Sequence, residues 1–165
     1  MKKLLWIAVL ALAYIYVSGY YSLSEAGVNR FLDEMETQSQ QGNADAVCAM
    51  FADNVEVSLQ DRSTRAPVNV TGGREQLCAM LKKMLPMQAA LISSTQVRRD
   101  DLKVERAWLH PWTADVSYTE HRTTTLSRGG MTVRTVSERK LRLVKTLVRV
   151  VIKRIEASIR IDNGG

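Results

Sequence analysis

The sequence predicts an α+β fold in which amphipathic helices come first and long strands follow. Three observations support this order: apolar residues recur at helical spacing in three segments of the first half, a strand separates the second and third of these, and residues 90–161 alternate. With 165 residues, of which 45% are apolar and 24% charged, the chain has room for one domain with a core and a small appendage.

An apolar stripe at one-turn spacing predicts the first helix of the domain, from Ser24 to a stop at Gly42. Asn43 is a good N-cap for a shorter second helix, which breaks at residues 52–54 and leads directly into a strand. In that strand the apolar residues alternate with polar ones, as in a half-buried strand. The first stripe is Val28, Phe31, Leu32 and Met35, and the strand residues are Val55, Val57 and Leu59.

A loop is expected at 60–70, and Thr71-Gly72-Gly73 opens a third helix that Pro86 is expected to end. Strands follow at 90–98, 102–109, 114–126 and 131–145, with a charged turn at 98–101 and a glycine hairpin at 127–130.

The last segment, 147–161, has apolar residues that fit either a helix or a strand. Because it is rich in valine and isoleucine and lacks a cap, we interpret it as a strand. The apolar residues expected to face inward stand at even-numbered positions up to Ile152 and at odd-numbered positions from Ile155. This change predicts a β-bulge near Lys153.

Residues 1–23 are expected to be a signal peptide or an N-terminal membrane anchor, followed by a domain over 24–165. Lys2 and Lys3 precede an uncharged run of 14 residues, from Leu4 to Val17. Counted to Leu23 the segment is long enough to cross a bilayer, with its tyrosines toward the far interface. Cleavage after Gly19 or Ala26 is the alternative. Either reading places the domain in the cell envelope, anchored in the inner membrane or released into the periplasm.

The net charge of +6 is concentrated near the C-terminus, because residues 127–165 contain 10 basic and 3 acidic residues. A solvated sheet face explains this better than nucleic-acid binding, since no DNA-binding motif accompanies it. Cys48 and Cys78 are candidates for a disulfide in an exported domain, worth roughly 3–4 kcal/mol, against two buried thiols as the alternative. No metal site or cofactor is expected, because two cysteines and two distant histidines form no ligand set.

From about Val28 to Ile161 the chain resembles the nuclear transport factor 2-like (NTF2-like) superfamily, and within it the SnoaL-like group. The likeness lies in AMFADNVEV at 49–57, GGREQL at 72–77 and RVVIKRIEASIRI at 149–161. The resemblance implies a cone-like, strongly curved antiparallel sheet with three N-terminal helices packed over its concave face. It also implies a pocket closed by the helices and, often, a homodimer through the sheet face.

The catalytic positions of ketosteroid isomerases, which share this fold, are apolar here. Their general base lies eight residues after the phenylalanine that corresponds to Phe51, and this position is Leu59. Their tyrosine donor on the first helix has no counterpart. His110 and Asp61 are the remaining candidates for an acid–base pair. Residues expected to line a pocket are Phe31, Met35, Phe51, Leu59, Met84, Trp108, Trp112 and Tyr118.

The sequence therefore favours a non-catalytic, exported or membrane-anchored domain that binds a small apolar ligand or a protein partner. One alternative is an isomerase, dehydratase or cyclase that uses His110 and Asp61. Another is a periplasmic assembly component of a secretion system, since type IV systems contain an inner-membrane component with one N-terminal anchor and a domain of this fold.

Overall fold

The structure is a computed structural model that describes residues 2–62, 68–107, 110–127 and 129–162. Its elements follow the expected order, with helices first and strands later. They are α1 (Lys2–Ser22), α2 (Glu25–Gln40), α3 (Ala44–Ala49), β1 (Phe51–Asp61), β2 (Val68–Gly72), α4 (Arg74–Leu91), β3 (Ile92–Glu105), β4 (Thr113–Leu126), β5 (Thr132–Lys145) and β6 (Val150–Ile161).

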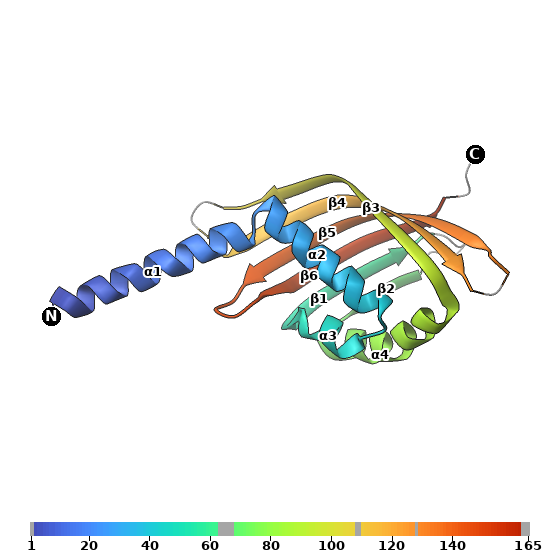
Figure 1. Cartoon of the computed structure of the whole chain (residues 1–165), viewed down its shortest axis with the longest axis horizontal. Coiled ribbons are helices and arrows are strands. Elements are labelled where there is room, and N and C mark those ends of the chain that lie inside the picture. Colours follow the sequence, from blue (N-terminus) through green and yellow to red (C-terminus); the bar gives the residue numbers. More distant parts are fainter. Residues whose placement is uncertain (1, 63–67, 108–109, 128, 163–165) are drawn as a thin grey trace.

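The six strands form one strongly curved sheet, and α2, α3 and α4 lie on its concave face (Figure 1). The strand order is β2-β1-β6-β5-β4-β3. All neighbours are antiparallel except β1 and β6, which run parallel. The α+β class and the curved sheet are confirmed, but the expectation of a wholly antiparallel sheet is wrong. Side-chain alternation defines the two faces of a strand and says nothing about its partner or direction.

Side-chain caps begin α2 and α3 at the predicted residues. The Ser24 hydroxyl oxygen accepts a hydrogen bond from the Gly27 N–H at 3.2 Å, and the Asn43 side-chain oxygen accepts one from the Ala46 N–H at 3.3 Å. Two residues of the predicted stripe of α2 are completely buried in the core between helix and sheet. The sequence suggested that Phe51 belongs to the second helix. In the structure β1 begins at Phe51, so this residue belongs to the sheet.

Helix α4 continues through Pro86 to Leu91, which corrects the prediction that proline ends it. Proline removes one helical N–H donor, and the tertiary contacts on both sides of it compensate for this loss. Leu85 is buried in the core, and the Leu91 carbonyl accepts a hydrogen bond from the Ser127 N–H at 2.8 Å. Local sequence could not reveal either contact.

Strand β3 is continuous, whereas two strands with a charged turn were expected. Asp101 has φ of +55°, and the pairing of β3 with β4 shifts between Asp100 and Lys103. The charged residues therefore form a bulge within one strand.

The C-terminal segment is a strand with the predicted bulge. Arg142 pairs with Arg154 and Leu143 pairs with Ile152, which leaves Lys153 without a partner in the ladder between β5 and β6. The extra residue lets apolar side chains on both sides of it point to the concave face.

A disulfide joins α3 to α4 through Cys48 and Cys78, whose Cα atoms are 5.6 Å apart. A salt bridge between Lys82 and Asp45, with 2.8 Å between Nζ and Oδ1, links the same two helices. These contacts fix the short helix α3 against α4 at the start of β1.

Helix α1 projects away from the sheet, and its C-terminal part contacts the domain (Figure 1). Leu23 is completely buried, and a Cβ atom added at Gly19 would lie 3.2 Å from the Pro111 carbonyl oxygen. The Arg106 guanidinium lies over the Tyr20 ring, 4.2 Å from its centroid. Among the described residues, no helix combines the length and the apolar character needed to cross a membrane.

Candidate functional site

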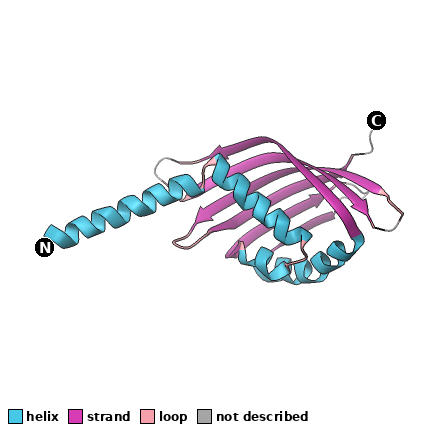
Figure 2. Cartoon of the chain, viewed as in Figure 1, coloured by secondary structure: helices cyan, strands magenta, loops and turns pink. Residues whose placement is uncertain are grey.

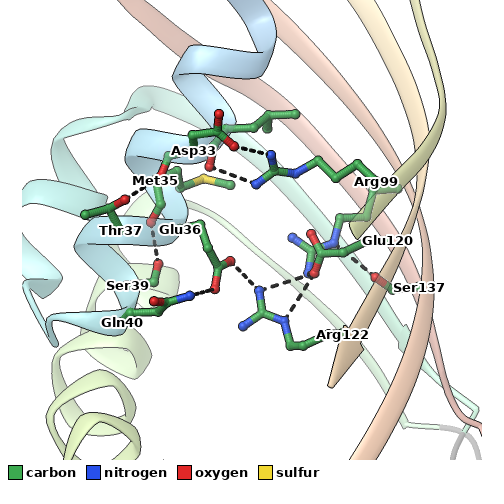
Figure 3. Close-up of polar contacts among 12 residues, drawn as sticks. Asp33, Met35, Glu36, Thr37, Ser39, Gln40, Arg99, Glu120, Arg122 and Ser137 are labelled. Carbon is green, nitrogen blue, oxygen red and sulfur yellow. Dashed lines mark hydrogen bonds and ion pairs between the residues drawn. The ribbon is translucent and has the colours of Figure 1, made fainter. Parts of the chain in front are cut away.

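A group of charged side chains lies on the concave face of the sheet, under α2 (Figure 3). Strand β4 supplies its centre, because Val116, Tyr118 and Glu120 point to this face and are at most 4% exposed. Arg122 continues the alternation. We call the following residues the concave cluster: Asp33, Glu36, Arg99, Tyr118, Glu120, Arg122, Ser137 and Arg139.

Glu120 is the most buried charged residue of the concave cluster and is held by two arginines. Its Oε1 atom accepts hydrogen bonds from Arg139 Nη2 at 2.7 Å and from Arg122 Nη2 at 3.2 Å. Arg139 also donates to the Ser137 hydroxyl, and Arg122 pairs with Glu36 of α2. Charges of both signs therefore alternate from the helix to the sheet, as a buried ionic network requires.

Arg99 forms the second link between the sheet and α2. It pairs with the Asp33 carboxylate and donates from Nη2 to the Leu32 carbonyl at 3.2 Å. Its Nε atom is buried and has no hydrogen-bond partner among the described residues. The two arginine links hold α2 across the strands of the concave face.

The Tyr118 hydroxyl is buried without a hydrogen-bond partner in the described part of the chain. Burial raises its pKa above the ordinary value, and the Glu120 carboxylate adds to this effect, whereas Arg139 and Arg99 oppose it. Tyr118 is therefore a neutral hydroxyl group at neutral pH.

A small cavity of about 130 Å³ lies where α2, α4 and β3 meet, with Glu36 and Arg122 among its lining residues. Ser39, Gln40, Gln88 and Thr95 contribute further polar groups. Typical ligand pockets enclose roughly 300–1,000 Å³ and are mainly apolar. This cavity suits a few water molecules better than an apolar ligand.

His110 and Asp61, the predicted acid–base pair, lie at different ends of the sheet. His110 precedes Thr113, which pairs with Val144, and Val144 pairs with Val151 of β6. Asp61 pairs with Ile159 of the same strand. Eight residues of a strand span roughly 26 Å. The two side chains therefore do not meet, and the His110 ring instead contacts Trp112 edge-on, with 5.6 Å between ring centroids.

The predicted pocket residues are divided between the core and exposed positions. Phe51 and Tyr118 are buried in the core, and Phe31, Met35 and Leu59 pack against it. Met84 on α4 and Trp112 in the turn before β4 are 44% and 42% exposed, and Trp108 lies outside the described residues.

Sequence reasoning identified Tyr118 as inward-facing but missed the rest of the concave cluster. Glu120 and Arg122 share the parity of Val116 and Tyr118, so the alternation of β4 was a usable signal. Glu36 lies one turn after Leu32 on the buried stripe of α2. The neighbourhood of Arg99 and Arg139 depends on strand register, which no local pattern contains.

These features define an NTF2-like cone, and comparison with solved structures confirms this fold. A protein of the NTF2-like family from Streptomyces avermitilis superposes with a TM-score of 0.56 at 14% identity, covering 82% of this chain and 97% of that chain. Aln2 from a Streptomyces species gives a TM-score of 0.59 at 18% identity, covering 82% and 89%. The chain thus has the expected NTF2-like, SnoaL-like fold.

A hexachlorocyclohexane dehydrochlorinase, LinA type 2, is also similar, with a TM-score of 0.58, 9% identity and coverage of 86% and 90%. No protein-family model and no curated protein matches the sequence. At these identities the likeness establishes the fold alone.

Proposed function

We propose that this chain is a non-catalytic NTF2-like binding domain of the cell envelope, held at the surface of the inner membrane by the apolar side chains of α1, with a protein partner on the uncovered face of its sheet. The observation that carries the proposal is the pairing within the concave cluster. Glu120, its central carboxylate, is 2% exposed and bound by two guanidinium groups. A general base must lie within reach of the substrate, and this carboxylate is buried with its Oε1 atom bound to Arg122 and Arg139.

The face of the sheet opposite the helices, which we call the outer face, offers a more accessible surface. Helices lie against the concave face and leave the outer face uncovered in the described part of the chain (Figure 2). A groove of about 350 Å³ runs over β4, β5 and β6, and its lining includes Asp115, Ser117, Lys140, Arg142, Arg154 and Glu156.

Exposed charges of both signs in this groove suit a protein partner of complementary charge, because such patterns direct specificity and association rate. Arg142 donates to both carboxylate oxygens of Asp115, at 2.8 and 3.1 Å, and Arg154 pairs with Glu56. A second copy of the chain is the first partner to test, since the resemblance implies such a dimer.

The surface and attachment of α1 support retention at a membrane. Its consecutive large side chains are exposed on every side, among them Trp6, Ile7, Leu10 and Tyr14, and a helix that is apolar all round requires an apolar environment. Cleavage after Gly19 or Ala26 would cut within residues that pack on the domain, which favours an uncleaved segment.

Photocrosslinking tests the proposed partner surface. A photoreactive amino acid at Glu156, in the outer groove, is expected to give a discrete adduct above the monomer mass in the producing cells, and Arg142→Glu is expected to weaken it. The same probe at Glu34, on the exposed side of α2, is the control. Absence of an adduct at Glu156, or equal adducts at both positions, would contradict the proposed surface.

The unpartnered Tyr118 hydroxyl favours a second candidate, an enzyme of the dehydratase or isomerase class that uses this group as a donor. For a non-catalytic core, Tyr118→Phe is expected to raise the free energy of unfolding by about 1 kcal/mol, because it removes a buried polar group without a partner. The midpoint of urea denaturation measures this. A destabilised variant would show that the hydroxyl has a bound partner and would contradict the stability expected for a non-catalytic core.

A further inference from the structure

We propose that the end of the domain next to α1 is a second membrane contact, in which Trp112, Leu147 and Val148 insert into the headgroup region of an anionic bilayer. We call these three residues the apolar end. This inference rests on the proposed retention of α1 at the membrane and adds a contact made by the folded domain itself. Leu147 and Val148 are 85% and 87% exposed, which is unusual for large aliphatic side chains.

The hairpin between β5 and β6 is built to present these two side chains. Thr146 closes the turn from both directions: its hydroxyl donates to the Arg149 carbonyl at 2.8 Å and accepts from the Arg149 N–H at 3.1 Å. Turn positions are normally filled by glycine, asparagine, aspartate or proline. Leucine and valine at this tip are therefore not explained by the turn itself.

The other hairpin at the opposite end of the sheet provides an internal comparison. Between β4 and β5, Gly129 and Gly130 have φ of +85° and +61°, as a tight turn requires. Met131, 63% exposed, is the large apolar residue beside that turn. Among the described residues of these two hairpins, large apolar side chains occupy the turn itself only in the one near α1, whereas the other turn has glycines and a single methionine beside it.

The apolar end and α1 face each other across a groove of about 300 Å³. Tyr14, Ile15 and Ser18 line it from the helix, and Trp112 and Leu147 line it from the domain. The hairpin tip therefore lies beside the C-terminal half of α1 and not beyond its end. If the N-terminal half of α1 enters a bilayer, the tip reaches the lipid boundary with it.

The chemistry around the groove matches a lipid interface. Tryptophan and tyrosine are enriched at the headgroup level of membranes, where Trp112 would join Tyr14 and Tyr20. Lys145 lines the groove and Arg149 follows the tip, and such cations are attracted to anionic lipid. Pro111 is buried and packs closely on the backbone of Gly19 in α1. This contact fixes the position of the neighbouring Trp112 relative to α1.

Tryptophan quenching in the full chain tests the inference. The protein is reconstituted in vesicles of phosphatidylethanolamine and phosphatidylglycerol with brominated acyl chains. A variant that retains Trp112 as its single tryptophan (W6F/W108F) is expected to lose emission relative to unbrominated vesicles, because a tryptophan at the headgroup level lies next to the acyl chains. Adding Leu147→Ser and Val148→Ser is expected to reduce this quenching. The matched control places the single tryptophan at Met131 (W6F/W108F/W112F/M131W) and is expected to show none.

A variant with Trp6 as the single tryptophan (W108F/W112F) separates the two proposals. Quenching of Trp6 without quenching of Trp112 would overturn the membrane contact of the apolar end and leave retention by α1 intact. No quenching of Trp6 would overturn retention itself. Equal quenching of Trp112 and of the Met131 control would show non-specific adsorption and would also overturn the inference.

Discussion

Replacing Glu120 with alanine is expected to lower the free energy of unfolding by about 3–5 kcal/mol, as for loss of one partner from a buried ionic network. Its side chain is 3% exposed and lies between Arg122 and Arg139, which are 29% and 18% exposed. Arg122 retains Glu36 as a partner, so most of the loss arises from the uncompensated charge of Arg139. Urea denaturation followed by circular dichroism measures the change.

Two further variants serve as comparisons for the Glu120→Ala measurement. Glu120→Gln keeps an acceptor of the same shape without its charge and is expected to lose less stability than the alanine variant. Glu138→Ala removes an exposed carboxylate from the adjacent strand β5 and is expected to change stability by less than about 0.5 kcal/mol. An equal decrease in the free energy of unfolding for Glu120→Ala and Glu138→Ala would show that the concave cluster does not stabilise the fold.

Local physical chemistry explains why the elements could be predicted from the sequence. Ser24 and Asn43 satisfy free amide groups at the helix starts, and these bonds need no distant partner. The alternation of β6 and its parity switch likewise depend on neighbouring residues, so the bulge at Lys153 followed from them. In contrast, the passage of α4 through Pro86 and the parallel pairing of β1 with β6 depend on tertiary contacts.

The candidate site was harder to predict because it is assembled from four elements. Asp33 and Arg99 are distant in sequence, as are Glu36 and Arg122, and only the packing of α2 on β3 and β4 brings each pair together. Sequence reasoning instead selected His110 for the usual pKa range of histidine. An acid–base pair needs both groups within reach of one substrate, and the sheet topology separates His110 from Asp61.

Removing the disulfide between Cys48 and Cys78 is expected to lower the free energy of unfolding by about 3–4 kcal/mol. The bond closes a loop with a sequence separation of 30, and without it the unfolded chain gains conformational freedom. Alanine at both positions suits the test, because Cys48 is 7% exposed and a polar replacement would add an unsatisfied group. Thermal or urea unfolding of the double variant beside the unaltered chain gives the difference.

The redox dependence of stability links this bond to the proposed export. Dithiothreitol is expected to lower the unfolding midpoint of the unaltered chain to that of the double alanine variant and to leave the variant unchanged. Lys82→Ala, which removes an exposed ion pair between the same helices, is the matched control and is expected to cost less than about 1 kcal/mol. Disulfides persist in oxidising compartments, so denatured protein taken directly from the cell envelope should contain no free thiol. Two free thiols, with a midpoint insensitive to reductant, would contradict both the stabilising role of the bond and its formation during export.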